Sequence, residues 1–403
     1  MQQDIIFVKN KYLILFLSLI SVLNISCSKK ETTYHYEIKE IHCEEMADLE
    51  TWVMFPYGNA ITYVYRESLN HENNDSKDVE EHYRLLNFDD ESVISIYPQI
   101  EDNEEIIVLL AFDENTFLFS TRYIDENEDL TCTYRINYQR NGERKILIER
   151  KVFDVDKCLL YEVVGDDVCF FTFYNDIKEG TADGIYGNEL WKITPEGELE
   201  CLDHREFEYK NYYLSEDANF YRRYYISSTP DKPTFTTNNR GDLTFNIVEE
   251  DNSITSYDIY EASEVGGHMV PIGDIILLDN VDFIGDYTID NPYYAKLYNP
   301  KTGTYTYSDK KWLIGNYCTF SNGYALISPR YVNTSEDCQS DYLVHYTDGK
   351  LESIPIDENE LKGIDFIKRI NDKSAFIEYQ SRTIENGKYV YENSFYIFSL
   401  VED

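Results

Sequence analysis

Short apolar and aromatic runs alternate with polar turns along most of this 403-residue chain. The segment LWKITPEGELECL at residues 190–202 shows the pattern, because two strand-like stretches flank a Pro-Glu-Gly turn. Similar segments occur at 295–307 and 342–356. Strand-like runs on both sides of a Gly or Asn turn are typical of β-hairpins, and their regular recurrence is typical of a repeat fold.

The hairpins recur at intervals of 46 to 57 residues, measured between the first apolar or aromatic residue of each one. These residues are Tyr83, Tyr134, Trp191, Phe245, Leu297, Leu343 and Tyr396. Most have a second hairpin upstream, for example around Gly58-Asn59 and around Glu114-Asn115. Each repeat therefore consists of strand A, a tight turn, strand B, a long polar loop, strand C, a tight turn and strand D. Four antiparallel strands in about 50 residues predict an all-β fold, a β-propeller.

The last repeat ends after its strand C, at the C-terminus of the chain. A lone strand-like segment, Tyr34 to His42, precedes the first repeat. Its pairing with the last strand C would close the ring and remove an exposed sheet edge. We therefore predict seven four-stranded blades closed by an N-terminal strand. Six blades is the alternative, because the two repeats between Asn211 and Asp309 have the least regular hairpins.

The N-terminus has the pattern of a signal peptide. Lys9 and Lys11 precede an apolar run, Tyr12 to Ile25, which stops at Ser26-Cys27. The run is shorter than the roughly 20 apolar residues that a transmembrane helix needs. The domain boundaries that follow are a signal peptide at 1–26, a tether at 27–33 and a single propeller domain at 34–403.

The stretch VLNISCSKK resembles the lipobox of bacterial lipoproteins, in which a cysteine receives the lipid. The resemblance implies lipid attachment at Cys27. The lipobox usually has Leu three residues before the cysteine, whereas here Asn24 holds that place and Leu23 lies one residue further away. Ordinary signal-peptidase cleavage nearby is the alternative.

The lipobox followed by propeller-like repeats resembles the uncharacterised lipoproteins with a β-propeller domain from Bacteroidota-type bacteria. The resemblance implies a protein of the bacterial cell envelope that is anchored to a membrane by lipid. The outer membrane is the expected one, with the protein facing the periplasm or the cell surface. It implies no particular reaction. The chain has no Gly-His followed by Trp-Asp, as WD repeats have, and it lacks the repeated Gly-Gly of kelch repeats and the glycine of sialidase Asp-boxes.

The formal net charge is −39 at pH 7. So acidic a chain repels phosphate backbones, which excludes nucleic acid as a partner. The charge serves solubility or, alternatively, attracts a cation or a basic partner. The cysteines other than Cys27 are odd in number and contain no CxxC spacing, so the sequence predicts neither a disulfide framework nor a zinc site.

The long B to C loops are the expected home of function, because loops on one face of a rigid scaffold usually carry it. We place them at 67–81, 124–130, 177–188, 229–241 and 331–341. The alternative is that they are solvated insertions without a ligand.

One loop carries a candidate metal site. Asp125, Asn127 and Asp129 match the first half of an EF-hand-like calcium loop, which makes calcium the one candidate cofactor. Leu130 replaces the glycine of the turn, and Ile136 stands where the bidentate Glu belongs. An ordinary acidic surface is the alternative interpretation.

No catalytic residue can be named from the sequence. It contains no G-x-S-x-G elbow, phosphate-binding Gly loop or His-centred metal motif. Trp52, Trp191 and Trp312 lie in or beside expected strands, where packing between blades is the expected role. Two function classes follow: a non-catalytic binding or scaffold module for a glycan, peptide or protein partner, or a propeller enzyme acting on polysaccharide as a hydrolase or lyase.

Overall fold

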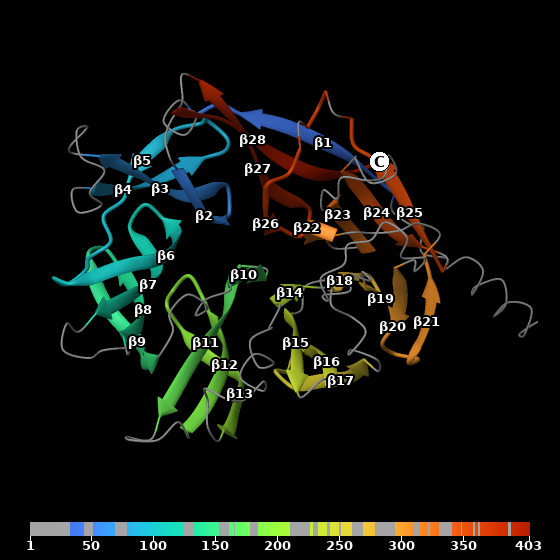
Figure 1. Cartoon of the computed structure of the whole chain (residues 1–403), viewed down its shortest axis with the longest axis horizontal. Helices are drawn as coiled ribbons and strands as arrows, with labels where there is room; N and C mark the ends of the chain where they lie inside the picture. The colour runs from blue at the N-terminus through green and yellow to red at the C-terminus, as the bar shows by residue number, and fades with distance from the viewer. Residues whose placement is uncertain are drawn as a thin grey trace, which may run out of the picture. The chain divides into compact units, whose positions relative to one another are not determined.

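In the computed structural model, the residues that can be described form 28 β-strands, which are numbered in chain order in Figure 1. The structure describes residues 33–43, 51–68, 79–124, 132–152, 161–164, 166–177, 184–209, 226–228, 233–239, 242–249, 251–259, 269–278, 295–308, 314–320, 323–329, 341–347, 349–357, 359–361, 363–385 and 388–403. Within these residues, no helix is both long enough and apolar enough to cross a bilayer.

The strands form seven four-stranded sheets, which we call blades 1 to 7 in chain order. Blade 1 contains β2 (Thr51–Tyr57), β3 (Ala60–Ser68), β4 (Val79–Asn87) and β5 (Val93–Ser95). Blade 2 contains β6 (Glu104–Asp113), β7 (Thr116–Ile124), β8 (Cys132–Arg140) and β9 (Glu143–Val152). Blade 3 contains β10 (Tyr161–Val164), β11 (Asp167–Ile177), β12 (Gly184–Ile193) and β13 (Leu199–Tyr209).

The later blades follow the same order of strands. Blade 4 contains β14 (Ile226–Ser228), β15 (Pro233–Asn239), β16 (Asp242–Val248) and β17 (Ile254–Ile259). Blade 5 contains β18 (Met269–Ile272), β19 (Ile275–Leu278), β20 (Lys296–Asn299) and β21 (Thr304–Tyr307). Blade 6 contains β22 (Ile314–Thr319), β23 (Tyr324–Pro329), β24 (Tyr342–Thr347) and β25 (Lys350–Pro355).

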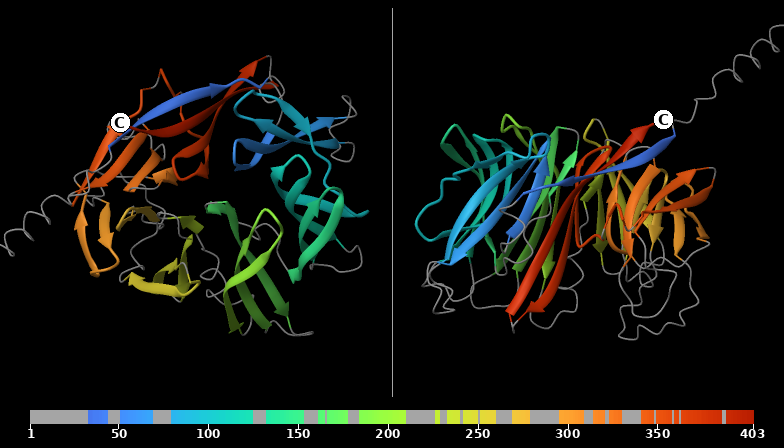
Figure 2. Two further views of the ribbon diagram at one scale, coloured as in Figure 1. Left: turned by 180° about the vertical axis from the view of Figure 1, so that it is seen from behind. Right: turned by 90° about the horizontal axis from the view of Figure 1, so that it is seen from above.

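Blade 7 is built from both ends of the chain. Its order is β26 (Phe366–Asn371), β27 (Ser374–Glu385), β28 (Lys388–Glu402) and, outermost, the N-terminal β1 (Tyr34–Ile41). Figure 2 shows the blue β1 running beside the red β28. The prediction that an N-terminal strand completes the last blade is therefore confirmed.

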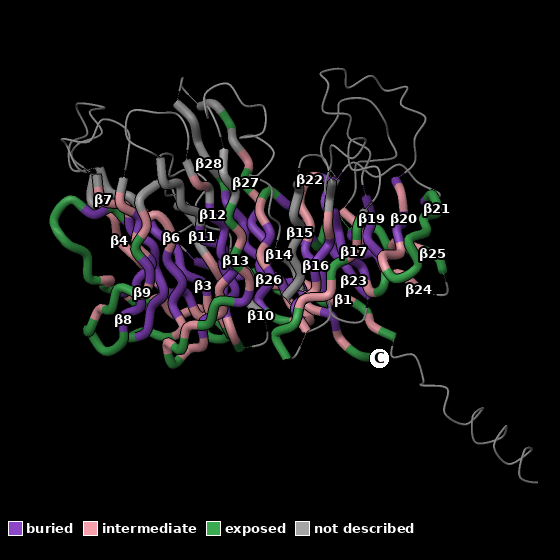
Figure 3. The backbone as a smooth tube through the Cα atoms, turned by 90° about the horizontal axis from the view of Figure 1, so that it is seen from below, coloured by how far each residue is buried: buried purple, intermediate pink, exposed green. Residues whose placement is uncertain are grey.

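The chain separates into a small terminal unit, Met1–Glu37 with Leu400–Asp403, and a large unit, Ile38–Ser399. In the large unit each blade packs on the next through apolar side chains. Figure 3 shows the buried residues, in purple, within the strands. Phe320 of blade 6 stacks on Phe398 of blade 7, with ring centroids 5.6 Å apart. Ile41 and Phe376 of blade 7 share a core cluster with Ile61 of blade 1. The seventh blade thus packs on the first, and the large unit is a closed β-propeller.

The seven sheets agree with the predicted seven blades rather than six. Each of the seven residues that marked the repeats lies in the third strand of its blade, from Tyr83 in β4 to Tyr396 in β28. Repeat spacing located the strands because a four-stranded blade has a nearly constant length.

One predicted loop is wrong. Residues 229–241 were expected to form the B to C loop of blade 4, but Pro233–Asn239 is β15, the second strand of that blade. Thr and Phe residues favour this strand, and Pro233 is tolerated because it is the first strand residue. The connection from β15 to β16 therefore contains only residues 240 and 241.

The strand connections define two faces of the propeller. We call the ends that carry the A to B and C to D turns the tight-turn face, and the opposite ends the long-loop face. Two-residue turns occur on the first face at Gly58-Asn59, Glu114-Asn115 and Asn141-Gly142. On the second face the B to C connections are short in blades 4 and 7 and longer in the others.

Candidate functional site

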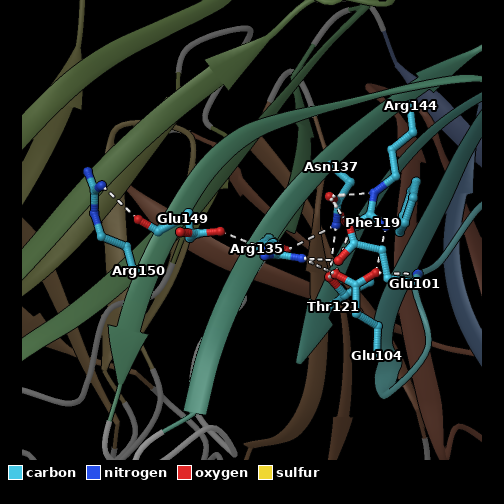
Figure 4. Close-up of polar contacts among 9 residues, drawn as sticks. All are labelled: Glu101, Glu104, Phe119, Thr121, Arg135, Asn137, Arg144, Glu149 and Arg150. Carbon is cyan, nitrogen blue, oxygen red and sulfur yellow. Dashed lines mark hydrogen bonds and ion pairs between the residues drawn. The ribbon is translucent and has the colours of Figure 1, made fainter. Parts of the chain in front are cut away.

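Two clusters of charged side chains lie toward the long-loop face, and they differ in how their charge is balanced. The first is centred on Glu104, the first residue of β6, whose side chain is fully buried. Arg144 from β9 donates hydrogen bonds of 2.5 and 2.7 Å to its two carboxylate oxygens. Arg135 from β8 donates a third, of 3.0 Å, and Thr121 a fourth, of 3.1 Å. Figure 4 shows these contacts converging on the carboxylate.

The Glu104 cluster is satisfied within blade 2. Burial raises the pKa of Glu104, but hydrogen bonds from Arg144, the Glu101 backbone and Arg135 outweigh it and lower the pKa to about 2. Asn137 accepts from Arg144 at 2.8 and 3.0 Å. Because cations and acceptors within the blade already occupy these groups, the arrangement is structural.

A similar arrangement joins blades 2 and 3. Arg150 of β9 donates to both oxygens of Glu189 in β12, at 2.8 and 3.1 Å. Trp191 donates its indole N–H to Thr172 at 3.0 Å and packs against the apolar cluster between the two blades. The predicted packing role of Trp191 is therefore confirmed. Trp312 lies outside the described residues, as does the side chain of Trp52.

The second cluster lies between blades 6 and 7, and we call its three acids, Asp341, Asp365 and Glu378, the seam cluster. Asp341 immediately precedes β24 and Asp365 immediately precedes β26. Glu378 lies in β27 opposite Phe366, the first residue of β26. Asp341 and Asp365 thus lie at strand ends on the long-loop face, and Glu378 lies beside the same end of β26.

Backbone contacts hold Asp365 in place between the two blades. Its N–H donates to the Glu378 carbonyl at 2.9 Å, and its carboxylate accepts from the Gln380 N–H at 2.7 Å. Asn316, from the inner strand of blade 6, donates to the Asp365 carbonyl at 3.1 Å. The seam cluster therefore rests on rigid strand ends of both blades.

The surroundings of the seam cluster raise the pKa of two of its carboxyl groups. Burial raises the pKa of Glu378 to about 7, and the charge of Asp365 adds to this rise. Burial also raises the pKa of Asp341 to about 6, against a hydrogen bond from Ser328 that lowers it. Within the described part of the chain, none of the three acids forms an ion pair with Lys, Arg or His.

This arrangement permits two kinds of chemistry. A cationic group placed among the three acids would favour their charged forms and bind more tightly as they ionise. A carboxyl group with a pKa near neutrality can also donate or accept a proton in a reaction at ordinary pH. A metal site is not indicated in the described ranges, which contain no group of three or more His, Cys, Asp or Glu placed to hold an ion.

Other contacts link blades that are not neighbours in the ring. The Tyr57 hydroxyl at the end of β2 in blade 1 donates to the Asp166 carbonyl in blade 3 at 2.9 Å. Burial, with the charges of Asp166, Asp167 and Glu196, raises the pKa of Tyr57 to about 12, so the phenol stays protonated. The inner strands β10 and β26, of blades 3 and 7, also contact each other. These contacts join inner strands that are not neighbours in the ring.

The structure does not test the site residues that the sequence predicts. Cys27 and the candidate calcium ligands Asp125, Asn127 and Asp129 lie outside the described residues, and calcium stays a prediction. Cys169 in β11 is fully buried, and Cys43 and Cys201 are free thiols within the described residues.

Sequence reasoning missed the seam cluster. A signal existed for Glu378, because it is an acid that directly follows the apolar run Ala375-Phe376-Ile377 within one strand. An acid that continues such a run is expected to be at least partly buried. Asp341 offered no comparable signal, since it ends a polar stretch of the kind that is common throughout the chain.

Comparisons with known proteins show only remote likenesses. No family model matches the sequence, and no curated protein is similar enough to count as a relative. Among solved structures, an acylaminoacyl peptidase of Pyrococcus horikoshii is 14% identical with a TM-score of 0.44, over 84% of this chain and 52% of that one. The present chain thus spans about half the length of that peptidase.

Two further solved structures match this chain over almost their whole length. The WD40 domain of SCAP from fission yeast is 8% identical with a TM-score of 0.39, and Zg3597, a family 117 glycoside hydrolase of Zobellia galactanivorans, is 7% identical with a TM-score of 0.29. In both cases the match covers 91% of this chain and 90% of the other. Likenesses this low assign no function, and the class of this protein, a β-propeller, follows from its own sheets and their packing.

Proposed function

We propose that this chain is a lipid-anchored protein of the bacterial cell envelope that binds a basic partner, without catalysis, through its long-loop face. The partner is a peptide or protein that presents Lys or Arg side chains. A glycan is the alternative ligand. The membrane anchor in this proposal is Cys27.

The seam cluster is the observation that supports this function. Glu104 in blade 2 is neutralised by arginines of its own blade, whereas Glu378, Asp341 and Asp365 have no cation among the described residues. The folded chain instead moderates their charge by raising the pKa of Glu378 and of Asp341. A Lys or Arg from a partner would replace those protons and gain hydrogen bonds to carboxylates, which are among the stronger ones in proteins. The net charge of −39 favours encounter with such a partner.

Binding of a fluorescent tetralysine peptide to the lipidated protein in detergent, followed by anisotropy, tests the ligand class. We expect Glu378→Gln combined with Asp341→Asn to weaken binding at least tenfold. The matched control is Glu352→Gln combined with Glu360→Gln, two exposed acids of the neighbouring surface whose loss should change affinity little. Equal affinity of the seam variant and the wild-type protein would refute the basic partner.

The pH dependence provides a second readout. A cationic ligand favours the charged carboxyls, so affinity for tetralysine should rise between pH 5 and pH 8, across the raised pKa values of Asp341 and Glu378. In the seam variant the rise should be lost. The control pair should keep it.

The anchor is tested separately in cells. A fatty-acid probe should label the wild-type protein and should not label Cys27→Ala, since the cysteine is the proposed lipid acceptor. Labelling of both proteins to the same extent would remove Cys27 from this role.

A polysaccharide enzyme is the second candidate, supported by one observation. Glu378, with a pKa of about 7, lies beside the ionisable Asp365, and acid chemistry on glycosidic bonds uses a carboxyl with a raised pKa. Release of reducing ends or of unsaturated sugars from a panel of polysaccharides would support this function if Glu378→Gln abolished it without lowering the melting temperature. Activity that survives in Glu378→Gln would exclude this residue as the acid.

A further inference from the structure

The N-terminal segment enters the large unit on the tight-turn face. Lys39 of β1 donates from Nζ to the Phe88 carbonyl at 2.5 Å, and the His42 N–H donates to the Glu91 carboxylate at 3.4 Å. Phe88 and Glu91 belong to the turn between β4 and β5, a C to D turn of blade 1. The first residues of the large unit are therefore fixed against a tight turn.

The strand next to β1 ends on the same face. Ser399 of β28 pairs with Ser374, directly after the A to B turn at Asp372-Lys373. Within the small terminal unit, the Asp403 N–H donates to the Thr33 carbonyl at 3.1 Å, and His35 Nδ1 lies 2.7 Å from Asp403 Oδ1. The strand that follows the tether is thus bonded to the C-terminal residue of the chain.

Chain length limits how far a lipid on Cys27 can lie from this entry point. Ile38 follows Cys27 by eleven residues, which span at most about 38 Å when fully extended. Tyr34 to Glu37 within this segment are residues of β1, so their extended conformation is already fixed.

The long-loop end of blade 7 lies close to the limit of that reach. From Ser374 to Glu385, β27 runs for eleven residue steps, which correspond to roughly 36 Å of strand. Turning the long-loop face onto the bilayer would require the anchor to reach past the whole height of the blade. Only an almost fully extended segment could span that height, which would cost most of the conformational entropy of the residues before β1.

We infer that the tight-turn face is turned toward the lipid bilayer and that the long-loop face, with the seam cluster, is presented to the compartment away from the membrane. This inference rests on the proposed lipid anchor at Cys27. The tight-turn face is held near the lipid by the tether rather than by attraction, because exposed acids such as Asp89, Asp90 and Glu114 populate its turns.

Energy transfer to the membrane surface tests the orientation. The lipidated protein is reconstituted into vesicles that carry an acceptor dye on their lipid headgroups, and an encoded fluorescent amino acid serves as donor. Two matched pairs compare the ends of a single strand: Asn115 with Tyr123 at the ends of β7, and Lys373 with Thr383 at the ends of β27. We expect greater transfer at Asn115 and Lys373, by at least twofold with a dye pair whose half-transfer distance is close to the height of a blade.

The outcomes separate this inference from the anchor. Protein that floats with the vesicles but shows equal or reversed transfer in both strand pairs would overturn the orientation and leave the anchor intact. Protein that does not float with the vesicles would overturn the anchor, and the orientation with it. Each donor variant must also melt at the wild-type temperature to be counted, which excludes poorly folded variants. The second strand pair repeats the comparison in another blade.

Discussion

Glu104 and Glu378 show how the surroundings of one residue type decide its role. Both lie where strands meet the long-loop face, and both are largely buried. Two arginines hold the pKa of Glu104 at about 2, whereas burial next to Asp365 raises the pKa of Glu378 to about 7. The first glutamate stabilises blade 2 as an ion, whereas the fold favours the protonated form of the second.

At the residue scale, we expect the effect of Glu378→Gln on the free energy of unfolding to depend on pH. The folded-state pKa of about 7 exceeds the ordinary value of 4.5, so the folded protein loses stability as pH rises from 4.5 through 7. The glutamine is neutral at every pH and removes this loss. Urea unfolding at pH 8 should show the variant to be more stable by on the order of 2 to 3 kcal/mol, with little difference at pH 4.5. A gain of the same size at both pH values would contradict the assigned pKa.

A second prediction at this scale concerns two glycines with positive φ. Gly197, at φ +86°, lies in the turn against blade 2, where an added Cβ would meet ring atoms of Tyr138 at 2.7 and 2.8 Å. Gly303, at φ +66°, has no atom within 4 Å of such a Cβ. Gly303→Ala should therefore cost only the backbone strain, about 1 to 2 kcal/mol.

Gly197→Ala adds a steric clash to the same strain, because the Tyr138 hydroxyl bonds to the Pro195 carbonyl at 2.8 Å and cannot move away freely. We expect its free energy of unfolding to fall by at least about 2 kcal/mol more than that of Gly303→Ala. Equal losses in chemical denaturation would mean that the Tyr138 ring moves without cost.

At the scale of the element, β1 has the largest consequence for the fold. It is the outermost strand of blade 7, and Ile41 at its end is 2% exposed in a core cluster shared by blades 7 and 1. A strand supplied by the N-terminus thus joins the last blade to the first. Its loss would expose the edge of β28 as well as apolar surface.

Deletion of the residues from Tyr34 to His42 should therefore cause partial unfolding or aggregation, seen as a lower melting temperature. A milder test is Ile41→Ala, which should cost about 2 to 5 kcal/mol because it leaves a cavity in the core. The exposed neighbour Glu40 provides the control, since Glu40→Ala removes no buried surface. Unchanged thermal stability in both the truncation and Ile41→Ala would show that the ring does not depend on this strand.

At the scale of the whole molecule, the net charge of −39 produces self-repulsion that a bound cation would relieve. The candidate ligands Asp125, Asn127 and Asp129 predict that calcium stabilises the protein. Calcium at a hundredfold excess over its dissociation constant would contribute roughly 2.7 kcal/mol.

The expected result is a calcium-dependent rise in melting temperature that a chelator reverses and that Asp125→Ala with Asp129→Ala reduces. Magnesium at the same concentration serves as the control, since its smaller ion requires a stricter octahedral geometry. A melting temperature that does not respond to calcium would remove the metal and leave the proposed partner of the seam cluster unaffected.

The repeat spacing alone was enough to predict the propeller, its seven blades and the N-terminal closing strand. Strand alternation and turn residues are local properties, and a blade of four short strands has a nearly constant length, so residues such as Tyr83 and Phe245 marked the third strand in each repeat. The same local reasoning failed at Pro233–Asn239, where a strand was expected to be loop because Pro, Asn and Gly surround it.

Only the tertiary structure separated the charged residues by role. In a chain with 75 acids, the sequence could not show that Glu104 meets Arg144, 40 residues away, or that Glu378 lies beside Asp365 without a cation in the described residues. Ion pairing and desolvation depend on distances across strands and between blades, which local pattern does not contain. The sequence therefore determined the architecture. The packing of blade 6 on blade 7 decided which acids lie without a neighbouring cation in the described residues.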